Sequence, residues 1–144
     1  MFASEGKKDS VSFIEETGEF VCNLATWELR EAMNAPSAPL PRGVNEMQRA
    51  GLEAAASRMV RPPRVKAAAC ALECKLVRIV SIGVVAGKPV DCHVVIGLGV
   101  GVHIDDRFIV EGRLDTAAMR PIARCGYDEY AVVEGVFAMQ RPLN

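Results

Sequence analysis

A polar turn near the start of the chain carries the residue types that bind a phosphate. The run Ser4-Glu5-Gly6-Lys7-Lys8-Asp9-Ser10 combines hydroxyls, ammonium groups and a glycine. A phosphate needs backbone N–H donors, a hydroxyl and a cation, and a glycine turn that leads into a helix supplies all three together with the helix dipole. We therefore predict a phosphate site for a nucleotide cofactor at this turn. Lysines beside a helix start also occur on ordinary surfaces, and that alternative stays open here.

The two histidines differ in their surroundings. His103 is followed closely by Asp105 and Asp106, whose carboxylates could orient its ring. It also ends a predicted strand, and such ends are where binding sites gather. We therefore take His103 as the candidate catalytic residue, with a structural role as the alternative. His93 lies within the same strand beside Cys92, and we expect a structural role for it.

Two further motifs do not support the chemistry that they suggest. The run Gly97-Leu98-Gly99-Val100-Gly101 is similar to a dinucleotide-binding loop, but that loop needs a glycine turn between a strand and a helix. Here the glycines lie inside a strand, where barrel curvature explains them better. Cys70 and Cys74 lack the C-x-x-C spacing and would lie about 13 Å apart on a strand, so we predict no metal site.

Composition places the chain among single globular domains. It has 144 residues, and 17 lysines and arginines nearly balance 18 acidic residues, so net charge does not indicate a partner. Aromatic residues make up 6% and form no basic-aromatic surface, so we predict no nucleic-acid partner. The start lacks a signal-peptide pattern, and the longest apolar run, Val94 to Val102, is about half a membrane span. We therefore predict a cytoplasmic protein with no membrane segment, whose five cysteines are reduced core thiols.

The apolar spacing predicts how the first half of the chain positions these residues. Met1-Phe2-Ala3 is expected to end a strand, and a helix should follow from Asp9 or Ser10 to Thr17, with Asp9 as its cap and Gly18 as its stop. The expected elements that come next are a strand over Glu19–Ala25, a helix over Trp27–Met33 capped by Thr26, and an excursion over Pro36–Pro63 with a helix at Val44–Leu52. The excursion is interpreted either as a lid over a site or as a surface loop.

The second half of the chain carries the clearest strand signal. Leu72, Cys74 and Leu76 alternate with charged residues, and the alternation slips at Val77-Arg78, which predicts a bulge. After a turn at Ala86–Pro89, eight apolar residues alternate strictly: Val90, Cys92, Val94, Ile96, Leu98, Val100, Val102 and Ile104. A strand of about fifteen residues would span about 50 Å if straight, so it must coil, as barrel strands do. Shorter elements are expected at Arg107–Val110 (strand), Asp115–Met119 (helical turn) and Tyr130–Val133 (strand).

Several segments together resemble one known family. Lys8-Asp9-Ser10 precedes the run Glu16-Thr17-Gly18-Glu19-Phe20-Val21-Cys22-Asn23, and this pattern resembles flavin reductase-like proteins with the FMN-binding split-barrel fold. The resemblance continues to about Tyr130, through Ala32-Met33-Asn34, Pro62-Pro63-Arg64-Val65, Ala71-Leu72-Glu73-Cys74 and Val100-Gly101-Val102-His103-Ile104-Asp105-Asp106.

The resemblance implies a fold, a cofactor and a reaction. The fold would be a β-rich α+β split barrel, with the phosphate of FMN held by Ser4, Lys8 and Ser10 in the turn that also contains Gly6 and Asp9. The family transfers a hydride from NAD(P)H to flavin, which is either tightly bound or passes to a partner oxygenase. His103 would be a polar group near the flavin ring or the nicotinamide, and the protein would be a homodimer. The alternative is a non-catalytic flavin-binding or dimerising interaction protein.

The sequence departs from the family pattern at two places. Tyr127 follows Arg124-Cys125-Gly126 where the family tends to have a second glycine. Members also usually carry some tens of residues ahead of the position of Met1, including strands that complete the barrel. We therefore expect residues 1–144 to be an FMN-binding domain without the family's N-terminal segment, with a barrel that is incomplete at that end.

Overall fold

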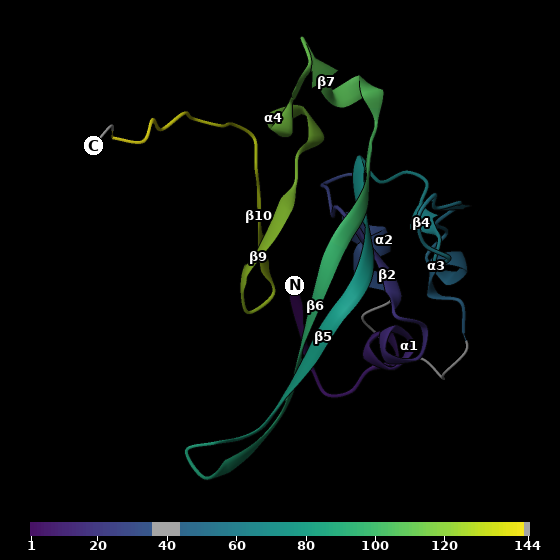
Figure 1. Ribbon diagram of the computed structural model, residues 1–144. Helices are drawn as coiled ribbons and strands as arrows, with labels where there is room; N and C mark the ends of the chain where they lie inside the picture. The colour runs from purple at the N-terminus through teal and green to yellow at the C-terminus, as the bar shows by residue number, and fades with distance from the viewer. Residues whose placement is uncertain (36–43, 143–144) are drawn as a thin grey trace.

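A curled antiparallel sheet forms the body of the protein (Figure 1). The structure, a computed structural model, describes residues 1–35 and 44–142, so the first part of the predicted excursion, including Pro36, Pro39 and Pro41, lies outside the described residues. Four strands pair in the order β1-β6-β5-β2. Their bounds are Phe2–Glu5 for β1, Glu19–Asn23 for β2, Cys70–Val85 for β5 and Lys88–Ile104 for β6.

The sheet continues beyond β2 through a short bridge. Thr26 pairs with Pro121, and the N–H of Ile122 donates to the carbonyl oxygen of Ala25 at 3.1 Å. This leads into the hairpin of β9 (Ile122–Gly126) and β10 (Glu129–Val132). The strands thus curl into a half-barrel, which confirms the predicted fold class, although β9 was not among the expected strands (Figure 1).

Helix α1 (Asp9–Thr17) follows β1 through the polar turn. Its periodic residues Val11 and Ile14 are buried, and Gly18 ends it with a φ of 70° while its N–H donates to Ile14 O at 2.8 Å. The predicted helix and its stop are therefore confirmed. The predicted cap is wrong by one residue, because Lys8 has the extended backbone of a cap and Asp9 is already helical.

The main core lies between α1 and one face of the sheet. It contains Val11, Ile14, Phe20, Cys74 and Val95, and Phe2 packs edge-to-face on Phe20 with ring centroids 5.9 Å apart. Val95 belongs to the face of β6 that carries the glycines and histidines. On the other face, which has the strict apolar alternation, Leu98 is 62% exposed and Val102 is 65% exposed.

The remaining elements are short. Helix α2 (Arg30–Asn34) starts three residues later than expected, because Thr26 is buried in the bridge to Pro121 and does not cap it. Helix α3 (Glu46–Arg49) confirms the helix expected near there. The other elements are β3 (Ala54–Ala55), β4 (Arg64–Val65), the 3-10 helix η2 (Asp106–Phe108), β7 (Ile109–Val110), β8 (Arg113–Leu114) and α4 (Thr116–Met119).

Irregularities in the β5–β6 pair decide which side chains are buried. The pairing register shifts between Leu76 and Arg78, which confirms the predicted bulge. A second shift lies between Glu73 and Cys74, and both of these side chains are buried while Leu72 is 45% exposed. The expected alternation, with Glu73 on the opposite face from Cys74, is therefore wrong, because Glu73 pairs with Gly101 and Cys74 with Gly99, and these two glycines share one face of β6.

The cysteines differ in their exposure to solvent. All five cysteines are free, but the expectation that all are core thiols is wrong, because Cys22 and Cys125 are exposed. Cys22 lies opposite Leu72 in the pairing of β2 with β5, and Leu72 is itself exposed. Among the described residues, no helix has both the length and the apolar character that a membrane crossing needs.

Candidate functional site

The polar turn is a tight loop between β1 and α1. Ser4 is buried, and its hydroxyl donates to Gly6 O at 2.9 Å, which closes the turn. Gly6 has a φ of 75°, and its N–H donates to Asp91 O on β6 at 2.9 Å. The N–H of Lys8 donates to Gly6 O at 3.0 Å. The turn is thus held from both sides and leads directly into the first residue of α1.

The start of α1 retains the groups that an anion needs. The cap residue Lys8 provides no side-chain hydrogen bond to the helix, and within the described part of the chain the backbone N–H groups of Asp9 and Ser10 have no acceptor. The side chains of Lys8 and Ser10 likewise have no partner there. Lys7 differs, because its ammonium forms an ion pair at 2.5 Å with Glu15, which lies further along α1. These groups fit a phosphate: two N–H donors, a hydroxyl and one uncommitted cation.

His103 is held by a residue that sequence reasoning did not select. Its Nε2–H donates to the Oε1 oxygen of Glu73, and the His103 side chain is 17% exposed. Glu73 lies on β5 opposite Gly101, two residues before His103 on β6. An ionised carboxylate only accepts hydrogen bonds, so this contact fixes the imidazole proton on Nε2.

Glu73 is fully buried, and its charge is balanced by hydrogen bonds. Its carboxylate accepts from the backbone N–H groups of Arg58 at 2.8 Å, Met59 at 2.5 Å and Val60 at 3.1 Å. Burial alone would raise the pKa of this carboxyl, but the His103 and backbone hydrogen bonds outweigh burial and lower the pKa from 4.5 to about 2. The three N–H groups form an anion-binding nest that is filled by a side chain of the same chain.

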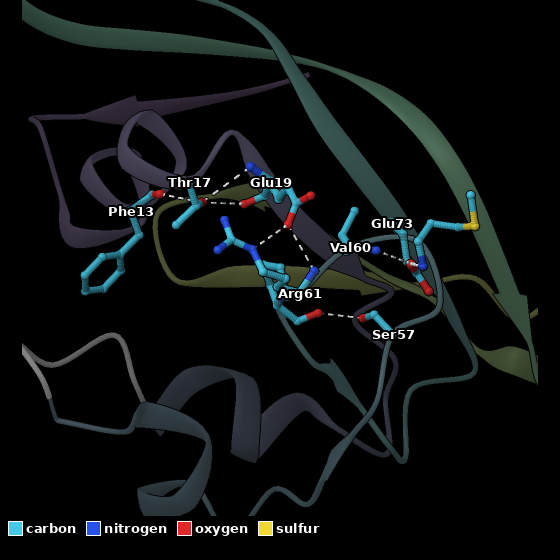
Figure 2. Close-up of polar contacts among 9 residues, drawn as sticks. Phe13, Thr17, Glu19, Ser57, Val60, Arg61 and Glu73 are labelled. Atoms are coloured by element: carbon cyan, nitrogen blue, oxygen red, sulfur yellow. Dashed lines mark hydrogen bonds and ion pairs between the residues drawn. The ribbon is translucent and has the colours of Figure 1, made fainter.

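A second carboxylate holds the next residue of the same loop (Figure 2). Glu19 on β2 accepts from the backbone N–H of Arg61 at 3.0 Å and from its Nε at 3.3 Å. These contacts lower the pKa of Glu19, with the backbone hydrogen bond as the largest cause. Ser57 Oγ also donates to Pro62 O at 2.5 Å. The later part of the predicted excursion is therefore a fixed segment joined to β2 and β5.

The predicted orienting carboxylates do not contact His103. Asp105 caps η2 by accepting from the N–H of Arg107 at 3.0 Å, and it pairs with the Arg107 guanidinium at 2.7 Å. The pKa of Asp105 is lowered by those contacts with Arg107. The expectation that Asp105 or Asp106 orients the ring is therefore wrong. Asp105 follows the end of β6 and pairs with Arg107. Glu73 lies across the strand pair from Gly101, which shares one face of β6 with His103.

The glycines of β6 make close packing possible. A Cβ at Gly97 would lie 2.7 Å from Phe20 Cε1 and closer still to Cζ, and one at Gly101 would lie 3.2 Å from Met59 Cγ. The dinucleotide-loop interpretation was excluded because these residues lie in a strand, and β6 confirms that placement. The sequence analysis attributed the glycines to strand curvature alone, but Gly97 and Gly101 also make room for the side chains of Phe20 and Met59.

The structure does not bring the two predicted parts of the site together. Ser4 pairs with His93 across β1 and β6, and the turn after it lies against Asp91. Ten residues separate His93 from His103, which is about 33 Å along an extended strand. The phosphate turn and His103 therefore lie toward opposite ends of β6.

The fold and the turn together define a class of protein. A strand-rich, curled half-barrel with few helices is a split-barrel architecture, and solved structures share it. Nitrilotriacetate monooxygenase component B from Bacillus cereus superposes with a TM-score of 0.86 at 28% identity, over 95% of this chain and 69% of that chain. A Shewanella frigidimarina protein with a split barrel domain gives 0.82 at 22% identity, over 99% of this chain and 69% of that chain.

The sequence comparisons then give the family. Residues 1–110 match the flavin reductase like domain, and the chain belongs to this family. An uncharacterized protein from Halalkalibacterium halodurans is 33% identical over 135 residues, covering 94% of this chain. The chain spans 64% of the length of that relative.

Proposed function

We propose that this chain is the FMN-binding part of a flavin reductase-like oxidoreductase that transfers a hydride from NAD(P)H to flavin. The observation that carries the proposal is the start of α1, where Lys8, Ser10 and backbone N–H groups that have no acceptor among the described residues converge at a fixed turn. Ser4 and Gly6 shape the turn, and Asp9 is the first helical residue beside it. Membership of the flavin reductase like family supports the same cofactor.

Each part of the chain has a limited role in this proposal. Bound flavin would supply the redox chemistry, namely acceptance of a hydride. The turn would hold the phosphate with Lys8 as the cation and Ser10 as a hydroxyl donor, while α1 adds its dipole. The five free thiols suit the reducing cytoplasm that we propose as the site of action.

A homodimer forms part of the proposal. Leu98, Val102 and Leu72 leave an exposed apolar surface on β5 and β6, and monomers rarely expose large contiguous apolar patches. We further propose that His103 lies near the flavin ring or the nicotinamide. An oxygenase partner for the reduced flavin is a further proposal, supported by the likeness to a monooxygenase component.

Two measurements test the function and its alternative. Titration of FMN into the purified chain should quench flavin fluorescence and raise the melting temperature of the protein. Oxidation of NADH or NADPH should then depend on both FMN and the chain. Absence of any flavin binding would refute the proposal, whereas binding without nicotinamide oxidation would favour a non-catalytic flavin-binding protein.

A further inference from the structure

A cavity of about 560 Å³ lies between the α2 segment and the β9–β10 hairpin. Trp27, Arg30 and Met33 line it from one side, and Arg124, Tyr130 and Val132 line it from the other. This volume is within the usual range for small-molecule sites. No residue of the phosphate turn lines it, so it is separate from the proposed FMN phosphate site.

Trp27 carries two guanidinium groups, those of Arg30 and of Arg120, whose Cζ lies 5.3 Å from the ring centroid, and Tyr130 carries one. Arg30 Cζ lies 4.0 Å from the centroid of the Trp27 ring, and Arg124 Cζ lies 6.0 Å from that of Tyr130. The guanidinium groups of Arg30 and Arg124 are also fixed to the backbone, since Arg30 donates to Trp27 O at 2.7 Å and Arg124 donates to Tyr127 O at 3.0 Å. A guanidinium has five N–H donors, so each arginine keeps donors for a ligand.

Two carboxylates also line the cavity and oppose an anion. Glu31 pairs with Arg30 at 3.4 Å, but its side chain is 82% exposed, so water screens its charge. Asp128 is exposed at the hairpin turn and forms no ion pair within the described part of the chain. Arg30 is the less exposed member of its pair, at 39% of its side chain. The less screened charge at the α2 side of the cavity is therefore positive.

We propose that this cavity binds a flat aromatic ligand that carries an anionic group. The ring would pack against Trp27 and Tyr130, and the fixed guanidinium groups of Arg30 and Arg124 would hold the anionic group. Guanidinium geometry matches the two oxygens of a carboxylate or phosphate, and aromatic faces favour a planar ring. The site goes beyond the proposed flavin chemistry and does not depend on it.

The single tryptophan makes the site directly observable. Trp27 is the one tryptophan of the chain, so its indole Nε1–H signal in an NMR spectrum reports on this cavity alone. Benzoate is the simplest probe with a ring and a carboxylate, and benzamide is its uncharged counterpart. Benzoate should shift the indole signal in a saturable way, and benzamide should bind at least about tenfold more weakly.

Three variants assign the contacts. Arg30→Gln and Arg124→Gln should each weaken benzoate binding about tenfold, since each removes a charged hydrogen bond. Asp128→Asn should strengthen it, because a repelling charge is lost. Circular dichroism checks the fold of each variant, and if Arg30→Gln does not fold, the exposed Arg124 and Asp128 variants carry the test.

Three results would overturn the inference. The first is an indole signal that does not move up to the solubility limit of benzoate. The second is equal binding of benzoate and benzamide, or a benzoate affinity that is unchanged in both Arg30→Gln and Arg124→Gln. The third is competition between benzoate and FMN, which would make the cavity part of the flavin site. A chain that binds no FMN but does bind benzoate would refute the proposed function and leave this inference intact.

Discussion

The imidazole of His103 donates a hydrogen bond to the fully buried carboxylate of Glu73. The same carboxylate accepts from three successive backbone N–H groups, those of Arg58, Met59 and Val60. One side chain of β5 thus joins β6 to the segment that precedes β4. A buried carboxylate with four donors stabilises the fold only while it is ionised.

The first prediction concerns acid stability. The pKa of Glu73 is lowered from 4.5 to about 2 in the folded state, so its contribution to stability is complete above about pH 4.5 and is lost as the pH falls toward 2. Denaturant unfolding between these pH values should show a steep loss of stability. Glu73→Gln should be less stable than the native chain at neutral pH and should flatten that part of the profile. A profile with the same slope in the variant would show that another group controls acid unfolding.

The second prediction compares two glycines of β6. Gly97→Ala should lower the free energy of unfolding by about 1–3 kcal/mol, because the new Cβ would overlap Phe20 and approach Lys75 O at 3.3 Å. Gly99→Ala is the matched control, because its Cβ would meet nothing within 4 Å. Urea unfolding of both variants checks this. An equal loss of unfolding free energy in both variants would show that glycine is required for backbone conformation rather than for packing on Phe20.

The third prediction concerns the turn where the sequence departs from the family pattern. Tyr127 has a φ of 50°, a left-handed conformation that costs a non-glycine residue energy, and its side chain is 92% exposed. Tyr127→Gly should therefore raise the free energy of unfolding by about 1 kcal/mol. Thermal melting measures the change, with Tyr127→Ala as the control that keeps the strain. A stabilisation of the same size in both variants would contradict this explanation.

The fourth prediction separates two adjacent lysines. Lys8→Gln should weaken FMN binding about tenfold, because the uncommitted cation at the helix start is lost. Lys7→Gln should have little effect, because Lys7 pairs with Glu15 on the helix. Fluorescence titration of FMN compares the two variants at one salt concentration. Equal losses would indicate attraction by general charge rather than a phosphate site at this turn.

Local sequence patterns were enough for several elements. The spacing of Val11 and Ile14 with the stop at Gly18 predicted α1, and strict alternation up to Ile104 predicted β6. The coil required of so long a strand predicted the barrel. These features depend on backbone periodicity and on steric limits that act within a few residues, so the sequence alone carries them.

The sequence by itself therefore determined the long elements α1, β5 and β6, the split-barrel family and the polar turn, while β9, the start of α2 and the partners of each side chain depended on the tertiary structure. The bulge between Glu73 and Cys74 turned Glu73 into the core, where segments distant in sequence supply its donors. The same packing buried Val95, on the glycine face of β6, in the core with α1 and left Leu98 on the other face exposed. Alternation separates the two faces of a strand, but which face is covered depends on where a helix packs, and register depends on pairing between distant strands.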